Sequence, residues 1–250
     1  MIVAVGSWRG LGATTTALLL AASLADRDGE AWLIEADPAG GVLAGRMRTE
    51  PHAIGGLERV AFASGAGTAL EAFDSAAQVA GALRVVTAPA DPFRAFACHQ
   101  PRVQWVHALR ELRGSVVVDV GRMRSGTPTW PLLRSADAVL VISSPEVSAA
   151  VSTADWIESG GRISPADPGL MGVDLRVAIV DAPGGVRFSH STLQHAMAGR
   201  LAGWLPWEAT AVDLLHRGAA PTDRRLRNSA VMHEAARMIE ALTTGAERER

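Results

Sequence analysis

A glycine-rich segment near the start of the chain has the residue types that bind an anion. Its sequence, GSWRGLGATT at residues 6–15, follows an apolar run at Ile2–Val5 that is typical of a buried strand, and a helix is expected from Thr14 onward. A glycine-rich loop between a strand and a helix directs several main-chain N–H groups and the positive end of the helix toward one point. The sequence therefore predicts an anion-binding loop at residues 6–15.

This loop departs from the usual phosphate-binding pattern where a cation is needed. In G-x-x-x-x-G-K-[ST], the lysine holds the terminal phosphates. Gly12 and Thr14 match the last glycine and the hydroxyl residue, whereas Ser7 replaces the first glycine. Ala13 replaces the lysine, and because the chain contains no lysine its 24 basic residues are all arginine. Arg9 is the nearest cation along the chain, and it is expected either to reach the phosphates or to be a solvated loop residue.

Two acidic residues follow apolar runs of strand length. Asp119 closes the valine run Val116–Val118, and Asp37 lies just beyond Ala31–Ile34. In a phosphate-loop protein, Asp119 is expected to order Mg²⁺ together with the hydroxyl of Thr14. The alternatives are that Thr14 simply begins a helix and that the two acids simply open turns.

These blocks resemble the ParA/MinD family of P-loop proteins. The loop is similar to the family's deviant Walker A motif, K-G-G-V-G-K-T-T, in which Trp8 stands at the signature lysine and Ala13 at the Walker lysine. The matched positions are Gly10, Gly12, Thr14 and Thr15.

Four further blocks carry the resemblance along the chain. LIEADP at 33–38 is similar to the family's D-x-D-P motif, with Glu35 in place of the first aspartate and Asp37 at the second. VVVD at 116–119 is similar to its Walker B strand, RSADAVLV at 134–141 to a later strand, and GWLPW at 203–207 to the G-x-L-P strand near the base. The resemblance extends from Ile2 to about Leu242 and is weakest at Pro51–Ala82.

The resemblance implies ATP or ADP with Mg²⁺ as the cofactor. Asp37 would orient the attacking water as the catalytic residue, and Thr14 and Asp119 would hold the metal. Asp181 stands where the family has a base-reading asparagine, although an ionised aspartate accepts hydrogen bonds but does not donate them. The expected nucleotide-binding residues are Arg9, Gly10, Leu11, Gly12, Ala13, Thr14, Thr15, Asp181 and Pro206.

Within the family, the sequence most resembles the CpaE/TadZ subgroup, the localisation proteins of Tad-type pilus machines. The loop ending Gly-Ala-Thr-Thr and the run VDVGR at 118–122 carry this resemblance. It implies a homodimer that positions or recruits a pilus, secretion or partition assembly. Because the loop lysine is missing, ATP hydrolysis is expected to be weak or absent. Trp8 is expected either to anchor the dimer or to pack beneath the loop.

Two other functions remain open from the sequence. One is a DNA-partitioning ATPase in which Arg9 supplies the lost charge, and the other is a scaffold that binds no nucleotide. DNA would contact a cluster of basic residues near the C-terminus, although such a cluster is more often a solvated surface. Its members are Arg217, Arg224, Arg225 and Arg227.

Composition excludes several classes of protein. Cys98 is the only cysteine, which rules out an intrachain disulfide or a multi-cysteine metal site and favours a reducing, cytoplasmic setting. A formal net charge of -2 gives no overall attraction to nucleic acid. No apolar run reaches the roughly 18–20 residues that would cross a bilayer, and the last helix has no basic polar face suited to a membrane surface.

Apolar runs of strand length alternate with helical segments, which predicts a doubly wound, mostly parallel α/β sheet with helices on both faces. One domain is expected at residues 1–243, followed by a charged, frayed tail at 244–250. The strands are expected at Ile2–Val5, Ala31–Ile34, Leu83–Ala88, Ser115–Val120, Ala138–Ser143, Leu175–Val180 and Leu201–Leu205. The helices are expected at Thr14–Ala25, Thr68–Ala82, Pro101–Leu112, Val147–Glu158, Ser191–Ala198, Thr210–His216 and Ser229–Leu242.

Overall fold

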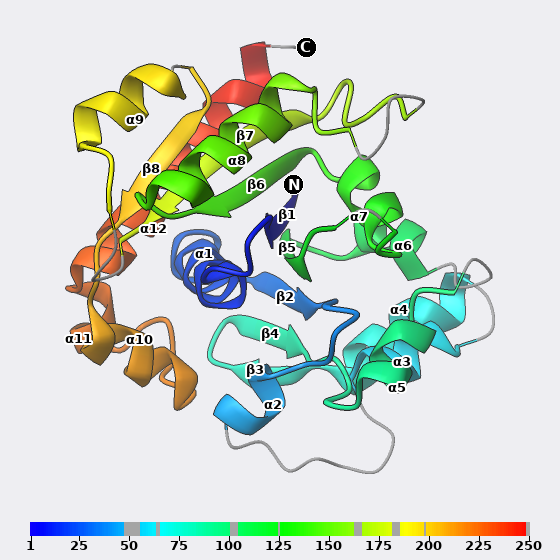
Figure 1. Cartoon of the computed structure of the whole chain (residues 1–250). Helices are drawn as coiled ribbons and strands as arrows, with labels where there is room; N and C mark the ends of the chain where they lie inside the picture. Colours follow the sequence, from blue (N-terminus) through cyan, green and yellow to red (C-terminus); the bar gives the residue numbers. More distant parts are fainter. Residues whose placement is uncertain are drawn as a thin grey trace.

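The computed structural model describes residues 1–47, 56–63, 66–100, 105–124, 126–162, 167–181, 186–197 and 199–248. Its centre is an eight-stranded sheet in the order β3-β4-β2-β5-β1-β6-β7-β8, in which only the edge strand β3 is antiparallel to its neighbour (Figure 1). The strands are β1 Ile2–Ser7, β2 Ala31–Glu35, β3 Gln78–Ala80, β4 Leu83–Val86, β5 Ser115–Arg122, β6 Ala138–Ser143, β7 Asp174–Val180 and β8 Leu201–Leu205.

Helices cover both faces of this sheet. On one face α1 and α12 pack against the strands, with α10 and α11 beside them. On the other face lie α3, α4, α6, α7, α8 and α9, over a core rich in tryptophan. Figure 1 shows α1 and α12 on the opposite side of the sheet from α4, α6 and α7. Because β1 and β6 are buried along their whole length, their apolar residues follow one another without alternation.

The helices range from one turn to five. They are α1 Ala13–Asp28, α2 Leu43–Arg46, α3 Leu57–Ala61, α4 Ala66–Ala76, α5 Pro92–Ala97, α6 Trp105–Ala108, α7 Trp130–Ser135, α8 Val147–Glu158, α9 His190–Ala196, α10 Ala209–His216, α11 Arg224–Arg227 and α12 Ala230–Arg248. Among the described residues, no helix is both long and apolar enough to cross a membrane.

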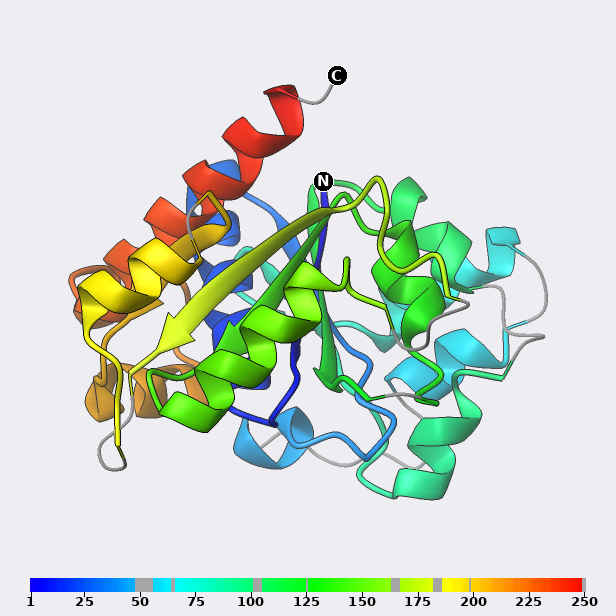
Figure 2. The same cartoon turned by 45° about the horizontal axis from the view of Figure 1, so that its top comes forward.

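The order of the strands determines where a ligand can bind. From β1 the chain moves toward β2 and β4, returns to β5, and then crosses β1 to β6, β7 and β8. The connections therefore change direction around β1. Open α/β sheets usually bind ligands at such a point, in the crevice at the carboxyl ends of the neighbouring strands. In Figure 2 the start of β1 and the end of α12 lie toward the top, so this carboxyl edge lies below.

The predicted fold class is confirmed, and Val147–Glu158 matches α8 residue for residue. The helix predicted at Thr68–Ala82 is wrong in its second half: α4 ends at Ala76, and residues 78–80 form β3. Gly81 adopts a φ of 65° and turns the chain back into β4, which the helical interpretation did not allow for.

Other boundaries also differ from the predictions. The segment predicted as a helix at Pro101–Leu112 contains only α6 and a 3-10 turn at Leu109–Glu111, and residues 101–104 lie outside the described residues. The last helix continues past Leu242 to Arg248. Helices α2, α3, α5, α7 and α11 were not predicted, since four to six residues are too few to show a helical period.

Candidate functional site

The loop between β1 and α1 has a conformation that exposes main-chain donors. Gly10 and Gly12 have φ angles of 76° and 67°, and Gly12 lies immediately before α1. The first turn of α1 leaves main-chain N–H groups without intrahelical partners, as in any helix. Leu11 differs, because its N–H donates to the Ser7 hydroxyl over 2.8 Å. The donors available to an anion are therefore those at the start of α1.

The lysine position of the loop lies inside the protein. Ala13 is 6% exposed and packs in the core beneath α1. Arg9 is exposed, and its guanidinium contacts the main-chain oxygen of Ser148 at 3.5 Å. The pKa of Glu146 is lowered mainly by hydrogen bonds from Ser148 and Ala149, and the charge of Arg9 lowers it further. Arg9 therefore faces the start of α8.

Asp119 lies in the carboxyl-terminal half of β5, three residues before its last residue, and is completely buried. Its Oδ1 accepts a hydrogen bond from the N–H of Gly121 over 2.9 Å, while its Oδ2 has no hydrogen-bond partner among the described residues. Burial raises the pKa of Asp119 to about 7, the Thr14 hydroxyl opposes that shift, and the charge of Glu35 adds to it. Thr14 is thus close to the carboxylate, although no hydrogen bond of normal geometry joins them.

Glu35 ends β2 directly opposite Asp119 in the parallel ladder. Its Oε1 accepts from the N–H groups of Val42 and Leu43 over 2.6 and 2.9 Å, and its Oε2 accepts from Ala88 over 3.0 Å. Burial raises the pKa of Glu35, and these three hydrogen bonds oppose the shift. The position that departs from the family's D-x-D-P motif therefore links the segments that follow β2 and β4.

Asp37 lies two residues beyond β2 and is half-buried. Its Oδ1 accepts from the N–H of Ala39 over 2.8 Å, and burial raises its pKa. Its carboxylate lies so close to the main chain of Gly121 that a Cβ at that glycine would overlap it. Gly121 has a φ of 63°, so both its conformation and this close approach require glycine.

The oxygen ligands at these strand ends are too few to hold a metal ion by themselves, but they suit Mg²⁺ that is bound together with a nucleotide. Within the described part of the chain, no three His, Cys, Asp or Glu residues could hold a metal together. Mg²⁺ bound with a nucleotide needs few protein ligands, because phosphates and water complete its shell. The Thr14 hydroxyl and the unpaired Oδ2 of Asp119 are such a pair.

A cavity of about 310 Å³ adjoins the first turn of α1 and the ends of β7 and β8. This volume is at the lower end of the range for cavities that bind small ligands. The residues lining it include four that the sequence predicted: Gly12, Thr15, Asp181 and Pro206. The sequence did not single out Glu208, Val212 or His216, which reach the cavity from α10 and the residue before it.

Asp181 and Trp207 mark two sides of this cavity. The Asp181 carboxylate forms an ion pair with Arg187, so it is already engaged by a cation. Trp207 is 63% exposed, which leaves its ring open to a planar ligand. The structure thus brings the loop residues, Asp181 and Pro206 to one side of the switch point, with Asp37 and Asp119 at the neighbouring strand ends.

Trp8 packs within its own chain. Its ring stacks on that of Trp156 with centroids 5.2 Å apart, and Trp156 contacts Trp130 at 6.3 Å. This is a contact within one chain, and a contact of Trp8 with a second copy stays a prediction. The stacking joins the loop to the aromatic core beneath α8.

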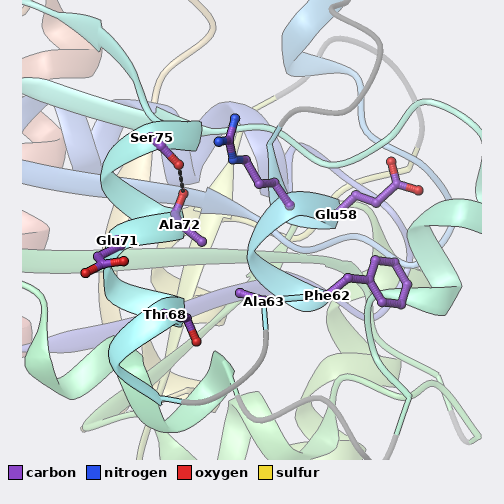
Figure 3. A pocket seen from close by; sticks show the side chains of 8 residues that line it. Glu58, Phe62, Ala63, Thr68, Glu71, Ala72 and Ser75 are labelled. Carbon is purple, nitrogen blue, oxygen red and sulfur yellow. Dashed lines mark hydrogen bonds between the residues drawn. The ribbon is translucent and has the colours of Figure 1, made fainter.

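A larger hollow, of about 770 Å³, lies between α3 and α4 and contains none of the predicted site residues. In Figure 3 the side chains of Glu71 on α4 and Phe62 on α3 point outward in opposite directions. Glu58 pairs with Arg94 of α5, and the Ser75 hydroxyl donates to the Ala72 carbonyl over 3.1 Å. Because its polar groups do not converge, this hollow lacks the features of a small-molecule site.

No protein-family model matches the sequence, and no curated protein matches it. Solved structures do match over almost the whole chain. The cell division ATPase MinD of Pyrococcus furiosus gives a TM-score of 0.72 at 15% identity, covering 97% of this chain and 98% of that protein. A ParA family ATPase from Chlorobium tepidum TLS gives 0.71 at 14% identity, covering 96% and 97%.

The septum site-determining protein MinD of Pyrococcus horikoshii OT3, solved with Mg-ADP, gives a TM-score of 0.72 at 14% identity, with coverage of 100% of this chain and 98% of that protein. Sequence identities this low establish similarity of fold alone. The chain therefore has the P-loop α/β fold of the MinD and ParA ATPases.

Proposed function

We propose that the chain is a ParA/MinD-like protein that binds ATP with Mg²⁺ at the β1–α1 loop and positions or recruits a partner assembly, with slow or no hydrolysis. One observation carries the proposal: the fully buried Asp119 keeps a carboxylate oxygen without a partner among the described residues, beside Thr14 and the loop. A buried carboxylate with an unused oxygen costs stability unless a ligand satisfies it. Mg²⁺ would satisfy it and would neutralise charge on the phosphates.

The other parts of the site support a nucleotide. The N–H groups at the start of α1, from Ala13 to Thr15, suit its phosphates, and the cavity beside Gly12 and Pro206 suits its base. Asp181 could accept a hydrogen bond from an amino group on that base, provided that it shares its carboxylate with Arg187.

The missing lysine supports slow turnover. A loop lysine stabilises the charge that develops on the transferred phosphoryl group. Ala13 cannot do so, and Arg9 faces Ser148. We therefore place the protein with positioning and recruitment factors, in a pilus, secretion or partition assembly, and we propose that it acts as a homodimer in the cytoplasm.

The structure gives less support to a DNA-partitioning function. Three of the four arginines expected to contact DNA are already paired with acidic side chains. Arg217 lies 2.8 Å from Asp213, Arg225 lies 3.0 Å from Asp223, and Arg227 lies 3.2 Å from Asp26. Each pair reduces the positive field that phosphate contacts require.

The test is equilibrium binding of ATP, with and without Mg²⁺, to the wild type and to Ala13→Lys, together with the hydrolysis rate. We expect Mg²⁺-dependent binding, turnover well below about 1 s⁻¹, and affinity roughly tenfold or more higher when a lysine is restored. Retention on DNA is measured on the same samples. No binding by either protein would favour the nucleotide-free scaffold, and fast turnover would overturn the claim of a slow enzyme.

A further inference from the structure

An arginine outside the expected site lies beside the loop. Arg122 is the last residue of β5, and an irregularity in the ladder places it opposite Ser7, the last residue of β1. A Cβ built on Gly10 would lie 3.5 Å from Cδ of Arg122 and 3.8 Å from its Nε. The Arg122 side chain therefore passes beside the loop, and its Cδ and Nε lie next to Gly10.

The guanidinium of Arg122 is available to a ligand. The side chain is exposed, and within the described residues no ion pair or hydrogen bond engages its charged end. Arg187, near the carboxyl end of β7, differs because it pairs with Asp181. An unpaired guanidinium directed along an anion-binding loop is suited to an anionic ligand.

Arg9 is the alternative cation for an anion at this loop, because it lies within the loop. Its guanidinium is directed to the main-chain oxygen of Ser148, and its charge acts on Glu146 at the start of α8. Arg122 instead extends from the strand that carries Asp119, three residues farther along the chain. One strand end would thus supply both a metal ligand and a cation to the same phosphates.

We propose that Arg122 binds the terminal phosphates of the nucleoside triphosphate and supplies the charge that Ala13 cannot. This inference rests on the proposed function, because it requires a nucleotide at the loop. The planar fork of a guanidinium donates two parallel hydrogen bonds to a phosphate, which a single ammonium does not. The lysine-free composition of the chain is then compatible with phosphate binding.

The experiment measures the affinity of wild type, Arg122→Ala, Arg122→Lys, Arg9→Ala and Arg224→Ala for Mg-ATP, tripolyphosphate and AMP by titration calorimetry. Arg122→Ala should weaken ATP and tripolyphosphate binding roughly tenfold to a hundredfold, the size of a lost charge-assisted contact. AMP lacks the terminal phosphates and should change less than about threefold, and Arg122→Lys should recover part of the loss. Arg9→Ala tests the alternative assignment and should weaken ATP binding less than Arg122→Ala does. Arg224→Ala, an exposed arginine on α11, is the control and should change ATP binding less than about threefold.

The outcomes separate this inference from the proposed function. If the wild type binds ATP and Arg122→Ala binds it equally well, or if Arg9→Ala loses as much, the assignment to Arg122 is wrong while the site stands. If the wild type binds neither ATP nor tripolyphosphate at millimolar concentration, the site and this inference are both overturned. Thermal unfolding of each variant checks that the exposed substitutions leave the fold intact.

Discussion

Two acids face each other across the ladder: Glu35 at the end of β2 and Asp119 in the carboxyl-terminal half of β5. Both are buried, at 1% and 0% exposure, and burial raises both pKa values. Glu35 receives hydrogen bonds from three main-chain N–H groups, whereas Asp119 receives one and has an unused Oδ2 among the described residues. The two carboxylates are equally buried, but the hydrogen-bonding capacity of Glu35 is used by the protein whereas part of that of Asp119 is not.

This difference separates an acid that holds the fold together from an acid that is available for ligand binding. A buried carboxylate with several main-chain donors stabilises the segments that supply them. One with an unused oxygen costs stability until a cation or donor arrives, which is the condition of many functional groups. Burial alone would have ranked Glu35 and Asp119 together, and the hydrogen bonds distinguish them.

The largest effect is expected at Glu35. Glu35→Ala leaves three main-chain N–H groups without their acceptor, at a cost of roughly 1–3 kcal/mol each when buried. We expect the free energy of unfolding to fall by about 3 kcal/mol or more, measured by urea denaturation. Glu35→Gln keeps one carbonyl acceptor and should lose less. A loss below about 1 kcal/mol for Glu35→Ala would show that these hydrogen bonds do not hold the strand ends together.

The second effect is expected at Gly121, where Asp37 approaches the chain. Gly121→Ala adds a Cβ that overlaps the Asp37 carboxylate and forces a positive φ on alanine. Gly29→Ala is the matched control, since Gly29 has a φ of 80° but no atom within 4 Å of the added Cβ. We expect a loss of about 1 kcal/mol for Gly29→Ala and about 2–3 kcal/mol for Gly121→Ala in thermal unfolding. Equal losses would mean that Asp37 moves aside without cost.

The sequence predicted the part of this region that depends on local pattern. Local patterns were enough to predict β1, α1 and the position of Asp119: the apolar runs, the glycine-rich loop and the acid after the valine run. A buried parallel strand and a glycine-rich turn each have a local sequence signature. The reason for glycine at 121 could not be predicted, because it depends on where Asp37 lies in space.

The remaining differences also have physical reasons. Glu35 was considered a substituted motif residue, and its partners at Val42, Leu43 and Ala88 lie up to 53 residues away along the chain. Arg122 was noticed within VDVGR but not as a neighbour of Gly10, since only the pairing of β5 with β1 brings them together. Arg9 was considered, with a solvated loop residue as the alternative, because it is the nearest cation along the chain, and closeness in sequence does not determine the direction of a side chain.

A smaller effect, of opposite sign, is expected at Asp119. Between its ordinary pKa and about 7, the folded protein binds more protons at Asp119 than the unfolded chain does, so the Mg²⁺-free protein loses stability as pH rises through this range. Asp119→Asn removes the penalty and keeps the acceptor for the Gly121 N–H. The raised pKa corresponds to a penalty of roughly 4 kcal/mol at pH 8, and the unpaired amide N–H of the asparagine offsets about 1–3 kcal/mol of this gain. We therefore expect the variant to exceed the wild type by roughly 1–2 kcal/mol at pH 8 and to have no advantage near pH 4.

The comparison with the wild type at each pH isolates Asp119, because Glu35 and Asp37, whose pKa values are also raised, are present in both proteins. Urea denaturation at the two pH values provides the measurement. The same variant should lose the Mg²⁺-dependent part of ATP binding. A variant that is less stable than the wild type at pH 8 would show that the charge of Asp119 is compensated by groups in the protein.

The smallest change in stability is expected at Asp37, which is less buried than Glu35 and Asp119. It is half-buried, and an asparagine can accept the same hydrogen bond from Ala39, so Asp37→Asn removes little but charge. Because solvent screens that charge, we expect stability at pH 8 to change by only a few tenths of a kcal/mol. If Asp37 orients water, Mg-ATP affinity should stay within about threefold while the residual hydrolysis rate falls at least tenfold. A loss of Mg-ATP binding as large as that of Asp119→Asn would instead place Asp37 in the metal site. Asp37 and Asp119 would then both serve ligand binding, and Glu35 would be the one acid of the three that serves the fold.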